Sequence, residues 1–260
     1  MFVSFAQQTQ TAAARDGAVA ILPLGAVETH GPHLPLGTDG IIAEGILDHV
    51  ARQDGSATPF VRLPLLWCGA SSEHAGRAGT LSMTPEQLIA QIEGIGEGLA
   101  RCGIQRVVLF NGHGGNIAPA SLAALKLRTR FNMLAASAHW LDFGLPEGLV
   151  PPSAPVADVH GGWIETSVLM HMAPQLVVRG AIAARAAAPP APSLFPPSLF
   201  PNGPIAWGWK LDDLAPRDGL GGWIGRPDLA TAAQGEMLLD HAGAKLLGLL
   251  HELAAAEWPR

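Results

Sequence analysis

Short apolar segments alternate along the chain with segments of helical spacing, and this alternation is the feature that most restricts the fold. Residues 17–25 form a short apolar run bounded by glycines, which is typical of a buried parallel strand, and residues 38–53 carry apolar side chains at helical intervals. The pattern continues with predicted strands at 60–68, 104–112 and 132–140 and predicted helices at 84–103 and 118–131. The sequence therefore predicts an α/β fold in which helices cover a mostly parallel central sheet.

One of the predicted helices has signals at both of its ends. Thr84 can act as the N-cap, Pro85 suits the first helical position, and Gln87 would complete a capping box. Gly103 is the expected stop signal at the other end.

Length and charge limit the class of partner. With 260 residues, of which 48% are hydrophobic, the chain can bury one sizeable core, so we expect a single domain over residues 1–260. The formal net charge of −6 and the lack of basic runs argue against binding to nucleic acid or anionic lipid, and favour a small-molecule substrate. The apolar tract at 229–258 contains charged side chains such as Glu236 and Lys245, so it predicts an amphipathic helix and not a membrane span.

The cysteines and the N-terminal sequence bear on location. The chain has two cysteines, Cys68 and Cys102, and its N-terminus lacks a basic segment followed by an apolar one. Neither feature points to secretion or to a disulfide framework. We therefore expect a cytoplasmic protein.

Histidines gather at the predicted ends of strands. Six of the ten histidines fall at strand exits or in the loops that follow, and four lie within helical patterns. Ligands bind beyond the carboxyl ends of the strands in doubly wound folds, so the six are expected to converge on one edge of the sheet. A single histidine there is more often structural, but six together indicate a site. The six are His30, His33, His74, His113, His139 and His160, and the four are His49, His171, His241 and His251.

Residues 22–40 place carboxylates and histidine directly after the first predicted strand. Glu28 and His30 are two residues apart on an extended segment and project to the same side, and Asp39 follows a turn rich in glycine and proline. Asp39 could instead cap the helix that begins beside it, but capping accounts for neither Glu28 nor His30. His113, flanked by glycines after another strand, supplies a second imidazole. This mixed donor set suits Zn²⁺, Mn²⁺ or Fe²⁺.

Three motifs, in this order along the chain, resemble those of the creatininase family: PLGAVETHGPHLPLGTDG, NGHGGN and DVHGGWIETSVLM. The resemblance implies a three-layer α/β/α sandwich, a two-metal centre, hydrolysis of an amide bond and a homo-oligomer, often a hexamer. It assigns metal ligands to Glu28, His30, Asp39 and His113, with Asp39 bridging two ions. It also assigns the catalytic histidine of the family to His160.

One position departs from the family pattern. Creatininase itself reads N-G-H-x-E-N and takes a metal ligand from the glutamate, whereas this chain has Gly115 there. We predict that Glu165, at the start of a helix five residues after His160, completes the second metal site and is needed for turnover. The alternatives are that Glu165 only complements the helix start, in which case the second metal is lost or His33 or water completes its site.

The predicted chemistry follows from two ions and a histidine. A metal pair holds a hydroxide near neutral pH and polarises a carbonyl, and His160 can pass a proton to the leaving nitrogen. We therefore predict a metal-dependent amidohydrolase that cleaves a non-peptide C–N bond of a small linear or cyclic amide with two divalent ions (Zn, Mn or Fe). When the sequence is compared with that of creatininase, Trp140 falls near the position of a tryptophan that contacts substrate there. The backbone at Gly114, Gly161 and Gly162 would let substrate approach closely.

Other functions remain as alternatives. The family also contains a deformylase and a peptidase of mycofactocin maturation, so a formamide or a small peptide is an alternative substrate. A non-catalytic, metal-stabilised protein is less favoured, because structural zinc sites prefer thiolates and the cysteines are not paired in sequence. A serine hydrolase is also less favoured, because the chain has no G-x-S-x-G motif and neighbours such as Ser71, Ser72, Glu73 and His74 rarely form a triad.

The segment at about 186–216 is rich in proline and also carries aromatic side chains. Its proline density excludes a regular helix or a central strand, and its aromatic side chains are too apolar for a plain linker. We expect either a loop that covers a pocket or a subunit contact, or a partly disordered insertion.

Overall fold

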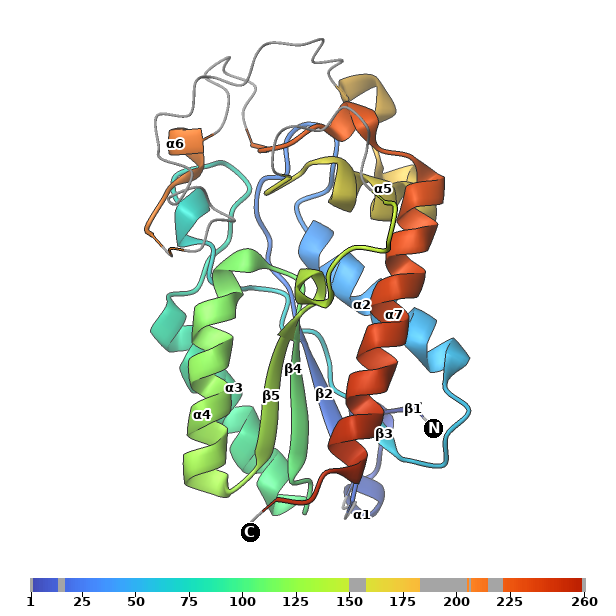
Figure 1. Ribbon diagram of the computed structural model, residues 1–260. Helices are drawn as coiled ribbons and strands as arrows, with labels where there is room; N and C mark the ends of the chain where they lie inside the picture. Colours follow the sequence, from blue (N-terminus) through green and yellow to red (C-terminus); the bar gives the residue numbers. More distant parts are fainter. Residues whose placement is uncertain are drawn as a thin grey trace.

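A parallel sheet forms the centre of the molecule. The computed structural model describes residues 2–13, 17–149, 158–182, 205, 207–214 and 222–258. Within them, five strands pair in the order β1-β3-β2-β4-β5, and every pair is parallel (Figure 1). The strands are β1 (Phe2–Ser4), β2 (Val19–Leu24), β3 (Phe60–Arg62), β4 (Arg106–Asn111) and β5 (Leu134–His139).

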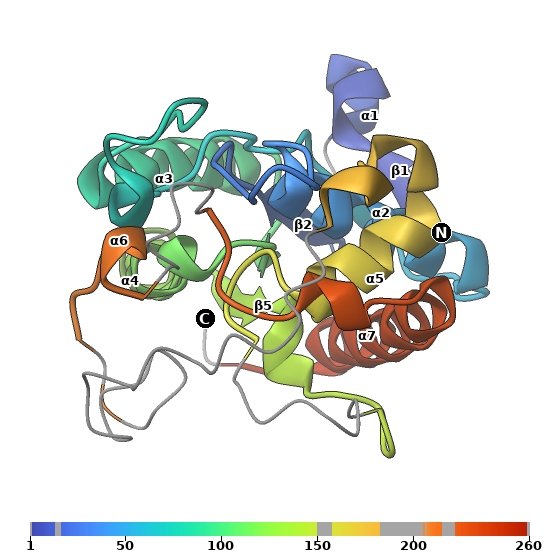
Figure 2. The same cartoon turned by 90° about the horizontal axis from the view of Figure 1, so that it is seen from above.

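Helices cover both faces of this sheet. One layer consists of α3 and α4, and the other of α2, α5 and α7 (Figures 1 and 2). The helices are α1 (Gln10–Ala13), α2 (Thr38–Gln53), α3 (Pro85–Arg101), α4 (Ile117–Phe131), α5 (Trp163–Met172), α6 (Leu211–Leu214) and α7 (Ala232–Ala255). Short 3-10 helices occupy Phe5–Gln7, Ser72–His74, Gly114–Asn116, Trp140–Phe143, Pro174–Leu176, Arg179–Ala181 and Pro227–Leu229. The predicted three-layer α/β/α sandwich is confirmed.

The strand β2 shows how the sequence builds these layers. Val19 and Ile21 pack into the core beneath α2, α5 and α7, whereas Ala20 and Leu22 pack into the core beneath α3 and α4. Alternate side chains of a strand point to opposite faces, and here both faces are covered. This explains why the strand is apolar at every position and not at every second one.

Two strands differ from the prediction. The edge strand β1 was not predicted, because three residues are too few to show a periodic pattern. The strand β3 ends at Arg62, earlier than the predicted 60–68. Pro64 lacks a backbone N–H and cannot continue a regular ladder, and beyond it only single contacts such as the Leu66 N–H to Pro23 O bond (3.0 Å) remain.

The helix-end signals have the predicted roles. The Thr84 hydroxyl accepts a hydrogen bond from the Gln87 N–H, and the Thr84 N–H donates to Gln87 Oε1 at 2.9 Å. Gly103 follows α3 with a φ of +76°, a conformation that favours glycine. The tract at 229–258 contains the amphipathic α7, and none of the described helices is long and apolar enough to cross a membrane.

Most of the proline-rich segment at about 186–216 lies outside the described residues. The described part contains the single-turn helix α6, whose Asp212 pairs with Arg77 in the loop before α3. The predicted role of the segment as a cover over a pocket or subunit contact stays a prediction.

Candidate metal centre

The candidate site lies at the carboxyl ends of β2 and β4, which is the edge of the sheet that the sequence predicts. There the loops after both strands meet the first turns of α2 and α5. The loops contribute Glu28, His30 and His113, and the helices contribute Asp39 and Glu165. All five residues are buried.

Glycines permit the close approach of these segments. A Cβ atom on Gly25, at the end of β2, would lie 2.7 Å from the Cα of Gly40 in α2. A Cβ atom on Gly112, after β4, would lie 2.3 Å from the carbonyl oxygen of Asp39. Only glycine allows backbone to pass this close, so these positions bring both strand exits onto the first turn of α2.

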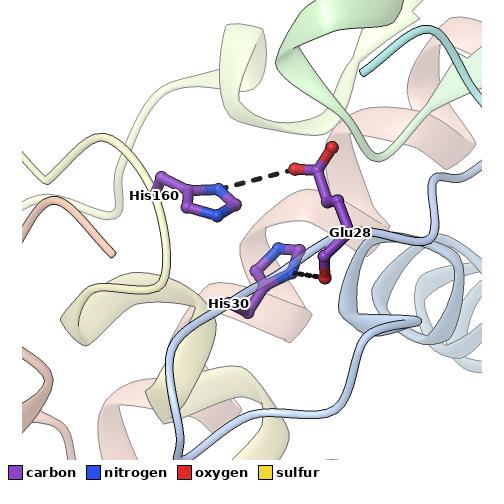
Figure 3. A group of neighbouring side chains, drawn as sticks. All are labelled: Glu28, His30 and His160. Atoms are coloured by element: carbon purple, nitrogen blue, oxygen red, sulfur yellow. Dashed lines mark hydrogen bonds and ion pairs between the residues drawn. The ribbon is translucent and has the colours of Figure 1, made fainter. Parts of the chain in front are cut away.

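Glu28 is the centre of a ring of histidines. Its Oε1 lies 3.2 Å from His74 Nε2, 3.3 Å from His113 Nδ1 and 3.6 Å from His160 Nδ1. Figure 3 shows that the carboxylate points to the ring of His160, while the backbone carbonyl of Glu28 contacts His30 Nδ1 at 3.1 Å. Burial raises the pKa of Glu28, but His113, His160 and His74 outweigh it and lower the pKa overall. Glu28 is therefore an ionised, buried carboxylate.

Asp39 lies between two of the histidines. Its Oδ1 is 3.3 Å from His30 Nε2, and its Oδ2 is 3.5 Å from His113 Nδ1. The N-cap of α2 is Gly37, and Asp39 lies in the first turn and not at the cap. The capping alternative is therefore wrong. The carboxylate faces the site and lies between His30 and His113.

The polar atoms of this cluster fit a bound cation. Several buried polar atoms of the cluster have ionic neighbours but no hydrogen bond within the described residues: Glu28 Oε1 and Oε2, Asp39 Oδ2, His30 Nε2 and His74 Nδ1. Such groups are costly to bury unless something else satisfies them. Three groups have ligand atoms within 4.8 Å of one another: Glu28, His30 and His160; Glu28, Glu73 and His113; and His30, Asp39 and Glu165. Carboxylate oxygens with imidazole nitrogens suit a divalent transition metal.

Glu165 reaches the cluster from the first turn of α5. Its Oε2 accepts a hydrogen bond from the Gly161 N–H at 2.6 Å and lies 3.9 Å from His30 Nε2. Burial and Asp39 raise the pKa of Glu165 to about 7, although His30 acts in the other direction. The side chain thus supports the helix start and also faces the predicted second metal site.

His160 is held with one ring nitrogen toward Glu28. Its Nε2 lies 2.6 Å from the Thr29 carbonyl oxygen, to which it donates, so that Nδ1 is free to accept and faces Glu28. The backbone of His160 pairs with Ile224, through bonds of 3.1 and 2.6 Å. Burial and His30 lower the pKa of His160 well below its usual range. The imidazole is therefore neutral in this setting.

Two of the six strand-exit histidines lie outside the centre. The Nε2 of His33 contacts the Gly161 carbonyl oxygen at 3.0 Å and the Thr166 hydroxyl at 3.2 Å, and the Nδ1 of His139 contacts the Asn111 carbonyl oxygen at 3.1 Å. Neither belongs to a group of candidate ligands in the described part of the chain. His33 thus braces the start of α5, which does not support the alternative that it completes the second site. The four histidines that were not predicted at strand exits, His49, His171, His241 and His251, lie in helices, as predicted.

The predicted substrate-contact residues differ in their surroundings. Trp140 is only 2% exposed and packs in the core beneath α2, α5 and α7. Gly161 has a φ of +58°, and a Cβ atom there would lie 2.8 Å from Trp223 Cβ. A Cβ atom on Gly162 would overlap Asp158, whose carboxylate accepts the first N–H groups of α5, whereas Gly114 has open space around it. The two later glycines therefore have a packing role, and substrate contact stays a prediction for all four positions.

The sequence prediction missed roles for two neighbours in the GASSEH segment. His74 was grouped with the strand-exit histidines, but its contact with Glu28 was not predicted. Glu73, from the 3-10 helix at Ser72–His74, places Oε1 3.2 Å from His113 Nε2. As a motif, the segment suggests only a serine triad, which the sequence does not favour. Its signal was an acidic and a basic side chain in a glycine-bounded loop after a strand.

Comparisons with known proteins identify chains of similar sequence and similar fold. The family model for creatininase, described as creatinine amidohydrolase, matches residues 5–250. A mycofactocin precursor peptide peptidase of Mycolicibacterium smegmatis is 34% identical over 222 residues, covering 85% of this chain and 79% of the relative. A creatinine amidohydrolase of Pseudomonas putida is 28% identical over 240 residues, covering 85% and 84%. A solved manganese creatininase superposes with a TM-score of 0.76 at 23% identity, covering 98% of this chain and 100% of that one.

Proposed function

The chain belongs to the creatininase family of hydrolases, and we propose that it is a metal-dependent amidohydrolase with two divalent ions in the cluster around Asp39. The observation that carries the proposal is the position of the Asp39 carboxylate, whose two oxygens face two different histidines, His30 and His113. Glu28 and His113 lie on one side of Asp39, and His30 and Glu165 lie on the other.

Glu28 and Asp39, which both lie near His113 Nδ1, would bind the first ion together with His113. His30, Glu165 and Asp39 would bind the second, with Zn, Mn or Fe as the candidate metals. When bound, such ions lower the pKa of water and polarise a carbonyl. Each ion would have three protein ligands, which leaves room for water and substrate.

His160 would move the proton in the reaction. Its Nε2–H is fixed on the Thr29 carbonyl oxygen, so its neutral Nδ1 can take a proton from water and deliver it to the leaving nitrogen of the amide. The ring has van der Waals neighbours in His30 and His74, at centroid distances of 4.2 and 4.4 Å, which limit its rotation.

Replacing His160 by alanine tests this role. We expect His160→Ala to keep its metal content and to lose roughly 10²-fold or more in kcat, because general acid–base catalysis typically contributes 10²–10⁴-fold. Elemental analysis and steady-state kinetics of the same preparation measure both quantities. Loss of metal from the variant would instead make His160 a ligand, in the group that it forms with Glu28 and His30.

The substrate is proposed to be an amide, with a small peptide favoured. The sequence predicted a non-peptide C–N bond, and the peptidase relatives do not support that restriction. A small cyclic amide is the second candidate, because a creatinine amidohydrolase is similar over most of the chain. Both candidates need the same cleavage of a carbonyl–nitrogen bond, so the choice between them depends on residues that contact the rest of the substrate.

The test of the proposed function is a paired metal and activity measurement. We expect purified protein to carry one or two transition-metal ions per chain, and a panel of short peptides, formamides and cyclic amides to contain a substrate. Chelation should abolish the hydrolysis, and Zn²⁺, Mn²⁺ or Fe²⁺ should restore it. Metal-free protein with full activity would refute the proposal.

We also propose a homo-oligomer and a cytoplasmic location. The resemblance to the family supports the oligomer, a hexamer by that likeness. Cys68 and Cys102 are free thiols, as expected of a protein in a reducing compartment.

A further inference from the structure

The two ring nitrogens of His113 face different surroundings. Nδ1 lies 3.3 Å from Glu28 Oε1 and 3.5 Å from Asp39 Oδ2, so it is the nitrogen that faces the proposed ion. Nε2 points the other way, to Glu73 Oε1 at 3.2 Å and to the Ala70 carbonyl oxygen at 3.1 Å. Once Nδ1 is a ligand, Nε2 carries the hydrogen, and both of these oxygens can accept it.

Gly115 makes room for the Glu73 carboxylate. A Cβ atom on Gly115 would lie 2.6 Å from Glu73 Oε1, 2.5 Å from His113 Nε2 and 2.2 Å from the Ala70 carbonyl oxygen. Any side chain at position 115 would therefore displace the acceptors of the Nε2–H. Where the N-G-H-x-E-N pattern has a glutamate, this chain has Gly115, and the carboxylate of Glu73 from another loop lies beside it.

The Glu73 carboxylate is placed where it can support His113 as a metal ligand. Its side chain is 16% exposed, so solvent only partly screens its charge. A histidine ligand usually donates its second N–H to a carboxylate or a carbonyl, which fixes the ring and makes the ligating nitrogen more basic. The carbonyl of Ala70 can fix the ring, but only the charged carboxylate adds strongly to the basicity.

We propose that Glu73 is a positioning residue, which accepts the Nε2–H of His113 in the space left by Gly115 and strengthens the bond from His113 Nδ1 to the first metal ion. The inference rests on the proposed metal centre. It assigns a function to the segment Ser71–His74 that does not involve a serine nucleophile. It also links Gly115 to Glu73, because the missing side chain at position 115 leaves the space that the Glu73 carboxylate occupies.

The test compares Glu73→Gln and Glu73→Ala with Glu147→Gln, an exposed control in the loop after the 3-10 helix at Trp140–Phe143. Glutamine keeps the size and an acceptor oxygen but removes the charge, and alanine removes the acceptor. The readout is the dissociation constant of Zn²⁺ at each site, measured by competition with a chromophoric chelator. We expect both Glu73 variants to weaken one site by about 10- to 100-fold and to leave the other site unchanged. Glu147→Gln should match the wild type.

A spectroscopic readout separates support of the ligand from general stability. In the Zn²⁺-loaded wild type, the His113 Nε2 proton should resonate downfield in ¹H–¹⁵N spectra because it is bonded to a carboxylate. Glu73→Gln should move this resonance upfield while circular dichroism remains that of the wild type. A purely structural role would leave the resonance in place.

The outcomes distinguish this inference from the proposed function. If both Glu73 variants keep wild-type zinc affinity and an unchanged Nε2 proton, Glu73 does not support the ring and the inference is wrong. If the wild type binds no zinc, the two-metal centre fails and the inference fails with it. If the wild type binds zinc, the variants bind it weakly, and no amide is hydrolysed, the inference holds and the proposed activity does not.

Discussion

Replacing Asp39 by asparagine should release both metal ions and lower kcat/KM by roughly 10³-fold or more, since the ions supply several kcal/mol of transition-state stabilisation. The Asp39 carboxylate faces His30 Nε2 at 3.3 Å with one oxygen and His113 Nδ1 at 3.5 Å with the other. Asparagine has nearly the same shape, but it replaces one oxygen with an NH₂ group, which donates and does not ligate. Metal content by elemental analysis and hydrolysis rates would measure the effect.

A matched control for this variant lies on the same helix. Asp48 is also in α2, but its side chain is exposed and pairs with Arg62 at the surface. Asp48→Asn should retain both ions and the wild-type rate, and should change the free energy of unfolding by no more than about 1 kcal/mol. If Asp39→Asn behaved like Asp48→Asn, Asp39 would not be the shared ligand and the two-ion arrangement would have to be abandoned.

The sequence predicted the layers of the fold because their signals are local. The helix α3 begins and ends as expected, since Thr84, Gln87 and Gly103 act within a few residues of the helix that they delimit. The strand β1 was missed for the opposite reason. Its three residues are defined by pairing with β3, which lies far away in sequence.

Only the part of the candidate site that is local in sequence could be predicted. Glu28, His30 and Asp39 share one short segment, so their convergence could be read from strand geometry and turn residues. The place of Glu73 beside His113 depends on how the loop after β3 folds back over the loop after β4. No periodicity or motif in a single sequence encodes that contact.

Gly115 shows how a motif can mislead when it is considered alone. In sequence it is a missing carboxylate, which suggests that a metal ligand has been lost. In the structure its lack of a side chain leaves room for the carboxylate of Glu73, while Glu165 approaches His30 from the other side. A change at one position of a site is therefore interpretable only with the groups that occupy the vacated space.

The remaining large effect is expected at Glu165, where the ligand role and the helix-start role make different predictions. Glu165→Gln keeps an oxygen that can accept the Gly161 N–H, so the start of α5 should persist. It removes the charge that faces His30 Nε2 at 3.9 Å. If Glu165 completes the second site, the variant should lose one ion per chain, keep the ion bound by Glu28, His113 and Asp39, and lose turnover by roughly 10²-fold or more.

The control for Glu165→Gln is Glu86→Gln, at the corresponding first turn of α3, where the carboxylate is exposed and belongs to none of the groups of candidate ligands in the described residues. A glutamate that only complements a helix dipole is worth about 0.3–1 kcal/mol, so Glu86→Gln should lower the melting temperature slightly and leave metal content unchanged. The ligand role requires Glu165→Gln to differ from this control in metal content and not only in stability. Full metal content with a near-normal rate would reduce Glu165 to a helix-start residue, and water or another side chain would then have to complete the second site beside His30 and Asp39.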